Sequence, residues 1–217
     1  WCYSIMNNYT EDKRRLKDLL KTYAYRKGEF KLSSGRTSEH YINCKPVILR
    51  GDGLTLASNL LLEKIPLASN CVAGLTLGAD PLVSGVVMAS HGFWDESAFK
   101  FGIPGGLIVR KKPKGHGTGA WLEGPLPPQG SVITILEDVI TTAKSAIFAA
   151  EKIRDAGYFV DHVVCIVDRQ EEGEADKACK DAKIKLTSIY KLDDIVPMHD
   201  DSFKSNDHEH MSLNMAK

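Results

Sequence analysis

Apolar and polar positions along the chain follow two different periods. Near the N-terminus, Leu16, Leu19, Leu20 and Tyr23 have the spacing i, i+3, i+4, i+7 that is typical of one face of a helix. Thr10 stands before this pattern and is of the residue type that caps helices, with acidic residues directly after it. We therefore predict an amphipathic helix that begins at Thr10.

Beyond this helix, short apolar runs alternate with helical patterns. Strand-like segments lie at 30–32, 41–43, 71–75, 107–110, 132–136 and 162–167, and helical patterns lie at 53–65, 81–89 and 146–156. The first two strand-like segments flank turn-forming residues and predict a hairpin. The later alternation predicts right-handed crossovers and a mostly parallel, twisted sheet flanked by helices, an α/β fold. With no internal repeat or linker in view, we expect an N-terminal extension over 1–9, one domain over 10–197 and a polar tail over 198–217.

Composition narrows the class of protein. The 217 residues include 28 basic and 28 acidic side chains, so the formal net charge is zero and nothing indicates binding to nucleic acid or to an anionic membrane. No apolar run approaches the roughly 20 residues that span a bilayer. The five cysteines are an odd number without metal-ligand spacing, which favours reduced thiols. We expect a soluble protein of a reducing compartment, the cytoplasm.

The segment VITILEDVITTAKS, residues 132–145, carries the clearest chemical signal. Its apolar run ends in Glu137 and Asp138, and ligands of open α/β sheets collect at the carboxyl ends of such strands. A hydroxyl-rich turn and a helix start follow, where free N–H groups can bind phosphate. The acids suit sugar hydroxyls. An ordinary strand-to-helix turn with an acidic cap explains this segment equally well when it is taken alone.

A second segment, residues 110–131, is too rich in glycine and proline for regular structure and too long for a simple connection. Positive charge is concentrated at its start, where Arg110, Lys111, Lys112, Lys114 and His116 lie within seven residues. Such cations on a glycine-rich hinge suit a mobile lid over a pyrophosphate leaving group. The alternative is a solvated surface loop.

Five motifs in order give the chain a resemblance. FKLSSGRTSEHYIN, GLTLGADPL, RKKPKGHGTGAWLEG, ILEDVITTAKS and IVDRQEEG together resemble the orotate phosphoribosyltransferase family, particularly its cyanobacterial form, from about residue 11 to residue 195. The resemblance implies the type I phosphoribosyltransferase fold, with a small N-terminal hood and a flexible catalytic loop. It also implies the transfer of ribose 5-phosphate from 5-phosphoribosyl 1-pyrophosphate (PRPP) to N1 of orotate, which gives orotidine 5′-monophosphate in pyrimidine synthesis. Magnesium would accompany PRPP, and a homodimer would share its lids between subunits.

The resemblance also implies roles for individual residues. Lys114, His116 and Asp138 match the catalytic positions, with Lys114 stabilising the leaving group. PRPP-binding positions are matched by Arg110, Lys111, Lys114, His116, Glu137, Asp138, Val139, Ile140, Thr141, Thr142, Ala143, Lys144 and Ser145. Orotate-binding positions are matched by Thr141 and by Arg169, whose planar fork suits a carboxylate; the alternative for Arg169 is a surface ion pair with Glu171 or Glu172. No residue is assigned as a direct metal ligand, and the metal would lie near Glu137 and Asp138.

Two departures from the family pattern fall in the phosphate turn. Relatives usually carry glycine at the position of Ala143, and often a small residue at that of Lys144. If position 143 needs a left-handed backbone, alanine costs roughly 1 to 2 kcal/mol there. Lys144 could instead add a cation beside the phosphate.

Two other functions stay open, a phosphoribosyltransferase for another base and a non-catalytic sensor of PRPP. Arg169 argues against a neutral base, and the retained lid cations argue against a sensor.

Overall fold

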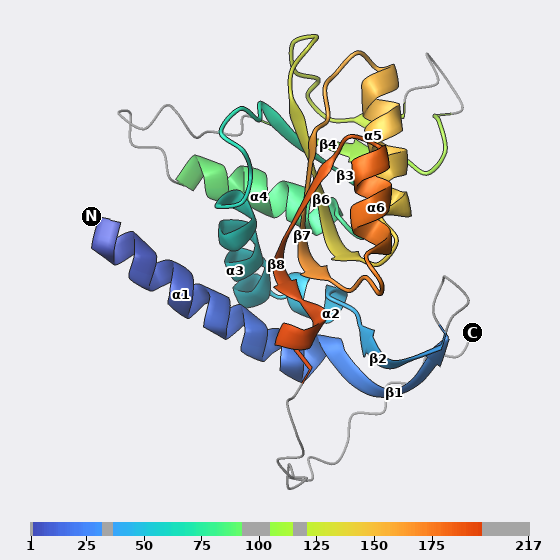
Figure 1. Ribbon diagram of the computed structural model, residues 1–217. Coiled ribbons are helices and arrows are strands. Elements are labelled where there is room, and N and C mark those ends of the chain that lie inside the picture. Colours follow the sequence, from blue (N-terminus) through green and yellow to red (C-terminus); the bar gives the residue numbers. More distant parts are fainter. Residues whose placement is uncertain (1, 32–36, 93–104, 115–120, 197–217) are drawn as a thin grey trace, which may run out of the picture.

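The computed structural model describes residues 2–31, 37–92, 105–114 and 121–196. Its main sheet has six strands in the order β5-β4-β3-β6-β7-β8, and a hairpin, β1-β2, forms a separate sheet (Figure 1). All neighbouring pairs in the main sheet are parallel except β4 with β5. The strands are β1 (Tyr25–Lys31), β2 (Thr37–Ile42), β3 (Cys71–Leu75), β4 (Gly106–Val109), β5 (Leu122–Glu123), β6 (Ile133–Ile140), β7 (His162–Asp168) and β8 (Lys185–Lys191). The predicted α/β fold is confirmed.

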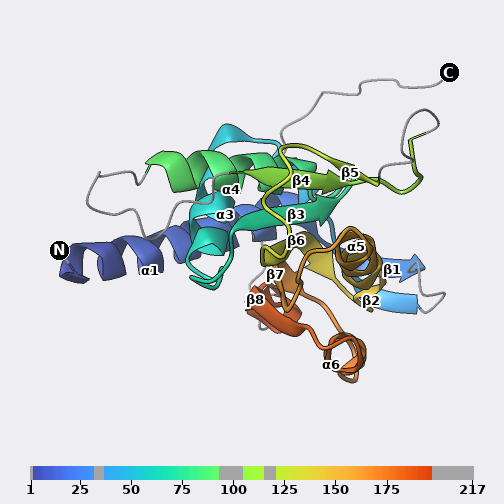
Figure 2. The same cartoon turned by 90° about the horizontal axis from the view of Figure 1, so that it is seen from above.

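Helices cover both faces of the main sheet. They are α1 (Cys2–Leu19), α2 (Lys45–Ile48), α3 (Gly51–Leu62), α4 (Asp80–Gly92), α5 (Lys144–Asp155) and α6 (Glu174–Asp181), with a π turn, η1 (Leu20–Ala24), after α1. Seen from above, α1, α3 and α4 lie on one side of the sheet, and α5 and α6 lie on the other (Figure 2). None of these helices in the described ranges is long and apolar enough to cross a membrane.

Each face of the sheet has its own hydrophobic core. Adjacent residues of one strand serve different faces: Val72 packs in the core with α1, α3 and α4, whereas Ala73 packs in the core with α5. Because both faces are buried, the central strands read as nearly continuous apolar runs rather than as an alternation. Cys44, Cys71, Cys165 and Cys179 are buried free thiols, which agrees with the prediction of reduced thiols.

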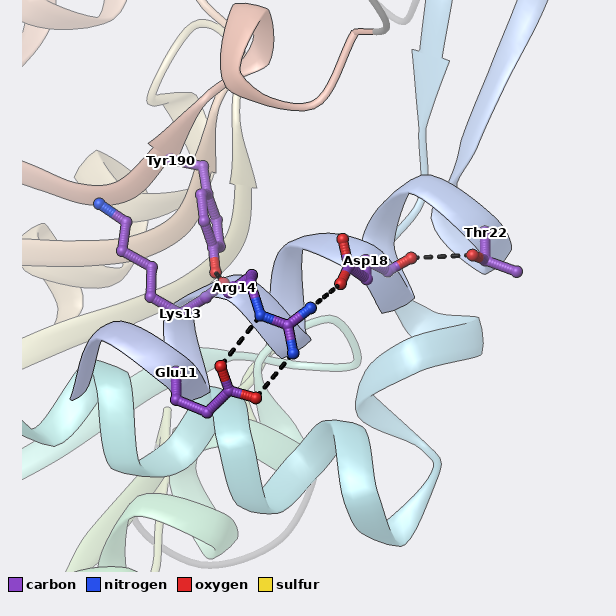
Figure 3. A network of polar contacts seen from close by, with 6 residues as sticks. All are labelled: Glu11, Lys13, Arg14, Asp18, Thr22 and Tyr190. Carbon is purple, nitrogen blue, oxygen red and sulfur yellow. Dashed lines mark hydrogen bonds and ion pairs between the residues drawn. The ribbon is translucent and has the colours of Figure 1, made fainter. Parts of the chain in front are cut away.

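The N-terminal helix differs from its prediction. Helix α1 begins at Cys2, so Thr10 lies inside it and the prediction that Thr10 is its cap is wrong. Arg14 forms ion pairs with Glu11 and Asp18 along the exposed face, and the hydroxyl of Tyr190 on β8 donates a hydrogen bond to the Lys13 carbonyl (Figure 3). These side-chain pairs all lie after Thr10, so they stabilise the part of the helix that the apolar spacing predicts.

Strand β6 is longer than the apolar run that predicts it. The run ends at Leu136, whereas β6 continues through Glu137 and Asp138 to Ile140. The pairing of β6 with β3 stops at Ile135, but its pairing with β7 continues to Ile140 opposite Asp168. The acids therefore lie within the strand, on a stretch that keeps one hydrogen-bonded neighbour and leaves the other side open.

Candidate active site

The site lies where the carboxyl ends of β3, β4 and β6 meet. Helix α4 leaves β3 toward one face of the sheet and α5 leaves β6 toward the other (Figure 2), which makes the β3–β6 boundary a topological switch point, the usual place for a ligand in an open α/β sheet. The turn after β3 contains a cis peptide bond between Thr76 and Leu77. A Cβ added to Gly78 in this turn would lie 3.3 Å from Oδ1 of Asp138, so the turn closely approaches the acid pair.

The two acids of β6 have different environments. Glu137 is buried, its Oε1 has no hydrogen-bond partner among the described residues, and burial raises its pKa to about 8, with a further increase from the charge of Asp138. Asp138 Oδ1 accepts a hydrogen bond from the Val139 amide at 2.9 Å, and Oδ2 lies 3.6 Å from Nζ of Lys45. Burial therefore favours the protonated form of Glu137.

Lys45 belongs to the site although the sequence analysis does not select it. It begins α2, and its amide is bound by the side chain of Asn43 at 3.2 Å. The preceding thiol, Cys44, is buried and lies 3.9 Å from the Asp138 carbonyl. The segment after the hairpin thus forms the wall of the site beside Asp138. Cys44 and Asp138 are 94 positions apart in the sequence, so no local pattern indicates this contact.

The phosphate turn has the backbone that glycine usually supplies. Ala143 has φ 59° and ψ 8°, in the left-handed region, and its methyl group is buried. Helix α5 starts directly after it, with no side-chain cap and no acid in the first turn. Lys144 and Ser145 are exposed on that first turn. The helix start therefore presents backbone N–H groups and one lysine to any ligand at this end of β6, an arrangement suited to an anion.

The basic segment after β4 meets a carboxylate that the sequence analysis does not select. Arg110 Nη1 donates to Oε1 of Glu123 on β5 at 2.9 Å, and Lys114 Nζ lies 3.6 Å from the same oxygen. Lys111 is exposed. The predicted catalytic residue His116 lies outside the described residues. Two of the predicted pyrophosphate cations are thus brought together, and Glu123 joins them.

Arg169 is a buried cation. Its backbone N–H donates to the Ile140 carbonyl at 2.8 Å, which places it directly beside the start of the phosphate turn at Thr141. The guanidinium Nε and Nη2 have no hydrogen-bond partner among the described residues. Burial lowers the Arg169 pKa, against the opposing charges of Glu171 and Tyr41. The side chain is only 6% exposed, and the charge of Glu171 acts on it.

The neighbours of Arg169 hold its backbone in place. Gln170 donates from its amide N–H to Asp168 Oδ1 at 3.1 Å and from Nε2 to Oδ2 at 2.9 Å. The Gln170 Oε1 atom accepts the N–H of Asp176 in the first turn of α6 at 2.9 Å. In this Asp-Arg-Gln clamp, the hydrogen bonds between Asp168 and Gln170 fix the turn after β7, and the side chain of Arg169 takes no part in them.

Solved structures resemble this arrangement. The orotate phosphoribosyltransferase of Mycobacterium tuberculosis in complex with Fe(III) dicitrate has a TM-score of 0.68 and 28% identity, and the match covers 86% of this chain and 99% of that one. The same enzyme in complex with PRPP has a TM-score of 0.65 and 26% identity, over 85% of this chain and 98% of that one. No protein-family model matches the chain. Fold and site together define a phosphoribosyltransferase.

Sequence comparison identifies the family of phosphoribosyltransferases to which the chain belongs. The orotate phosphoribosyltransferase of the cyanobacterium Thermosynechococcus vestitus is 47% identical over 183 residues, which cover 84% of this chain and 92% of the relative. The chain belongs to the orotate phosphoribosyltransferase family.

Proposed function

We propose that this chain transfers ribose 5-phosphate from PRPP to N1 of orotate, with PRPP lying across the ends of β3, β4 and β6 and the orotate carboxylate on Arg169. The observation that carries the choice of orotate is the Arg169 guanidinium, which is buried beside Thr141 with two nitrogens that have no partner among the described residues. Two buried guanidinium nitrogens without hydrogen-bond partners are costly, and a planar carboxylate satisfies both with two parallel hydrogen bonds.

PRPP fits the site in three parts. The 5-phosphate would bind the turn from Thr141 to Ser145, where the N–H groups of α5 and Lys144 supply positive potential. The ribose hydroxyls would bind Glu137 and Asp138, and the backbone of Val139 and Ile140 connects these two subsites. The pyrophosphate would reach the cations after β4, including Arg110, Lys111 and Lys114. The solved structure of the M. tuberculosis relative contains PRPP, which supports PRPP as the substrate.

The chemistry needs charge and position rather than a protein nucleophile. The bond between the anomeric carbon and the pyrophosphate oxygen breaks, and its electron pair leaves with pyrophosphate. N1 of orotate releases its proton to solvent and bonds to the anomeric carbon. Positive charge develops on the sugar while negative charge grows on the leaving group, so carboxylates near the ribose and cations near pyrophosphate both stabilise the transition state. In this scheme Asp138 faces the ribose, and Lys114 and His116 stabilise the leaving group.

Magnesium is part of the proposal. The described residues contain no group of three or more His, Cys, Asp or Glu side chains arranged to hold a metal. The unpartnered Oε1 of Glu137 and the neighbouring carboxylate of Asp138 would suit an ion that arrives already bound to a diphosphate. Mg²⁺ prefers oxygen ligands and commonly binds through substrate phosphates and one or two carboxylates. When bound, it would neutralise charge on the leaving group.

Assembly and location complete the proposal. A homodimer, in which the loop after β4 serves the neighbouring subunit's site, is what family membership favours. A cytoplasmic location fits the four buried free thiols. Neither an acceptor other than orotate nor a non-catalytic sensor is favoured by a particular observation. The two unpartnered nitrogens of Arg169 suit an acidic acceptor, and the leaving-group cations are present.

The test compares Arg169→Met with Arg15→Met, which removes an exposed arginine from α1. We expect Arg169→Met to raise the KM for orotate by about 10- to 100-fold, because a charged hydrogen bond contributes about 1.5 to 3 kcal/mol. The KM for PRPP should stay within about twofold of the wild-type value. The midpoint temperature of thermal unfolding of Arg169→Met, measured without ligands, should rise, because a buried charge with two unpartnered nitrogens is removed. An unchanged KM for orotate would place the acceptor elsewhere.

A further inference from the structure

Glu123 holds the cations at the exit of β4. The same oxygen of Glu123, Oε1, accepts a hydrogen bond from Arg110 at 2.9 Å and lies 3.6 Å from Nζ of Lys114. Arg110 Nε also donates to the Lys112 carbonyl at 3.3 Å, so the guanidinium folds back over its own segment. All three side chains of this cluster, Arg110, Lys114 and Glu123, are 40% to 57% exposed.

The backbone fixes the position of this carboxylate. Strand β5 pairs antiparallel with β4, with Glu123 opposite Ile108, and the Arg110 amide donates to the Trp121 carbonyl at 2.8 Å. Gly124 follows with φ 127°, and a Cβ there would lie 2.5 Å from the Gly106 carbonyl oxygen. The chain must therefore turn at glycine directly after Glu123, which keeps the carboxylate beside the end of β4.

We propose that Glu123 is a positioning residue that occupies Arg110 and Lys114 in the substrate-free protein and releases them to the pyrophosphate group. This inference rests on the proposed role of those two cations. A carboxylate and a phosphate offer the same kind of oxygen acceptor to a guanidinium or an ammonium. Pyrophosphate must therefore displace Glu123, and part of its binding free energy offsets the lost ion pairs.

Two consequences follow from this exchange. Without Glu123, Arg110 and Lys114 would repel each other and spread over many rotamers, so the carboxylate keeps them together near the site. The same carboxylate competes with the product, so it weakens the hold on free pyrophosphate and favours its release. A residue that served only the fold would not change the affinity for pyrophosphate.

Titration with inorganic pyrophosphate, in the presence and absence of Mg²⁺, tests the exchange. Glu123→Gln keeps the size of the side chain but removes its charge, and Glu151→Gln removes an exposed acid from α5 as the matched control. Isothermal titration calorimetry should give a dissociation constant for Glu123→Gln about 3- to 10-fold below that of the wild type, from two exposed ion pairs of about 0.2 to 1 kcal/mol each. Glu151→Gln should match the wild type, and the difference should shrink as salt is added.

The other outcomes are informative. If Glu123→Gln binds pyrophosphate no tighter than the wild type, or more weakly, the exchange is wrong. A wild-type protein that binds no pyrophosphate would instead contradict the proposed role of Arg110 and Lys114. Glu123→Asp keeps the charge but shortens the side chain, so that one oxygen no longer reaches both cations. Glu123→Asp should also bind pyrophosphate more tightly than the wild type. If Glu123→Gln is unstable, the affinity of Glu123→Asp tests the exchange in its place.

Discussion

Ala143 combines a strained backbone with a useful methyl group. Its left-handed φ of 59° costs a residue with a Cβ roughly 1 to 2 kcal/mol, while burial of one methyl contributes about 0.8 kcal/mol. The buried methyl group therefore offsets part of the backbone strain, which explains how this position accepts alanine. The fold therefore does not require glycine at this position, and any cost of alanine falls on the approach of the phosphate to the turn.

Ala143→Gly tests this balance. We expect the free energy of unfolding to change by less than about 1 kcal/mol, because strain is relieved while a buried methyl is lost and the unfolded chain gains freedom. The KM for PRPP should stay the same or fall. Denaturant unfolding and steady-state kinetics measure the two quantities, and a large loss of kcat/KM would mean that the methyl group has a positive role in the site.

Glu137 makes the ligand-free protein sensitive to pH. Its folded pKa of about 8 lies above the ordinary value of 4.5, so between these values the folded state binds more protons than the unfolded state. The contribution of Glu137 to stability is therefore complete below about pH 4.5 and is lost as the pH rises toward 8.

Glu137→Gln, which cannot ionise, should remove this dependence. Between pH 5.5 and 7.5 the wild-type free energy of unfolding should fall relative to the variant, by at most about 1.4 kcal/mol per pH unit. Urea unfolding at several pH values, with chelator and without substrate, provides the comparison. Parallel curves for the two proteins would show that Glu137 titrates near its ordinary pKa.

At the scale of elements, local patterns predict the central strands well and their ends less well. Strand β3 has the predicted bounds, because its apolar run and its turn residues coincide. The end of β6 is predicted too early, because Glu137 and Asp138 interrupt the apolar run although β7 still supplies hydrogen bonds to this part of the strand. Strand β8, at the sheet edge with polar residues on it, and helix α6 have weak apolar signals, and we do not predict them.

The candidate site shows the same division. Motifs select Asp138, Arg110 and Arg169, each of which stands at or near a strand end. Motifs do not select Lys45 and Glu123, because their contacts depend on the segment after the hairpin and on the antiparallel strand β5, which only the tertiary structure brings to the site. The left-handed turn at Ala143 is a conditional prediction from the family's glycine, and the backbone fulfils the condition.

The clamp after β7 gives a prediction at this scale. Gln170→Ala removes the side-chain bonds from Gln170 to Asp168 and to the Asp176 amide, so Arg169 should lose its fixed orientation. We expect a higher KM for orotate, by about 3- to 10-fold, with less change in the KM for PRPP. Lys177→Ala, which breaks an exposed pair with Asp181 on the same helix, is the control. Equal effects on both substrates would indicate a general loss of structure instead.

For the whole molecule, the sheet joins two cores and places the site at the boundary where the helices change sides. Lys45, from the segment after the hairpin, meets Asp138 at this edge, and the loop after β4 begins at the same edge of the sheet. In the proposed homodimer, the loop of one subunit completes the other's site, which mixed dimers can test.

Lys114→Ala and Asp138→Asn should each be nearly inactive as pure proteins. If Lys114 acts in the neighbouring site, refolding or exchanging equal amounts together should restore up to about a quarter of wild-type activity, because about half of the dimers are mixed and each has one complete site. Size-exclusion chromatography establishes the dimer in the same samples. No recovery in dimers that demonstrably exchange subunits would mean that each loop serves its own site.

The most direct test of the account is the reaction itself. Purified protein is incubated with Mg²⁺, PRPP and orotate, and the ultraviolet absorbance of orotate is followed. We predict that absorbance falls only when all components are present, with orotidine 5′-monophosphate and pyrophosphate formed in equal amounts. No loss of orotate beside an active control enzyme, or consumption of PRPP with adenine or hypoxanthine in place of orotate, would contradict the account.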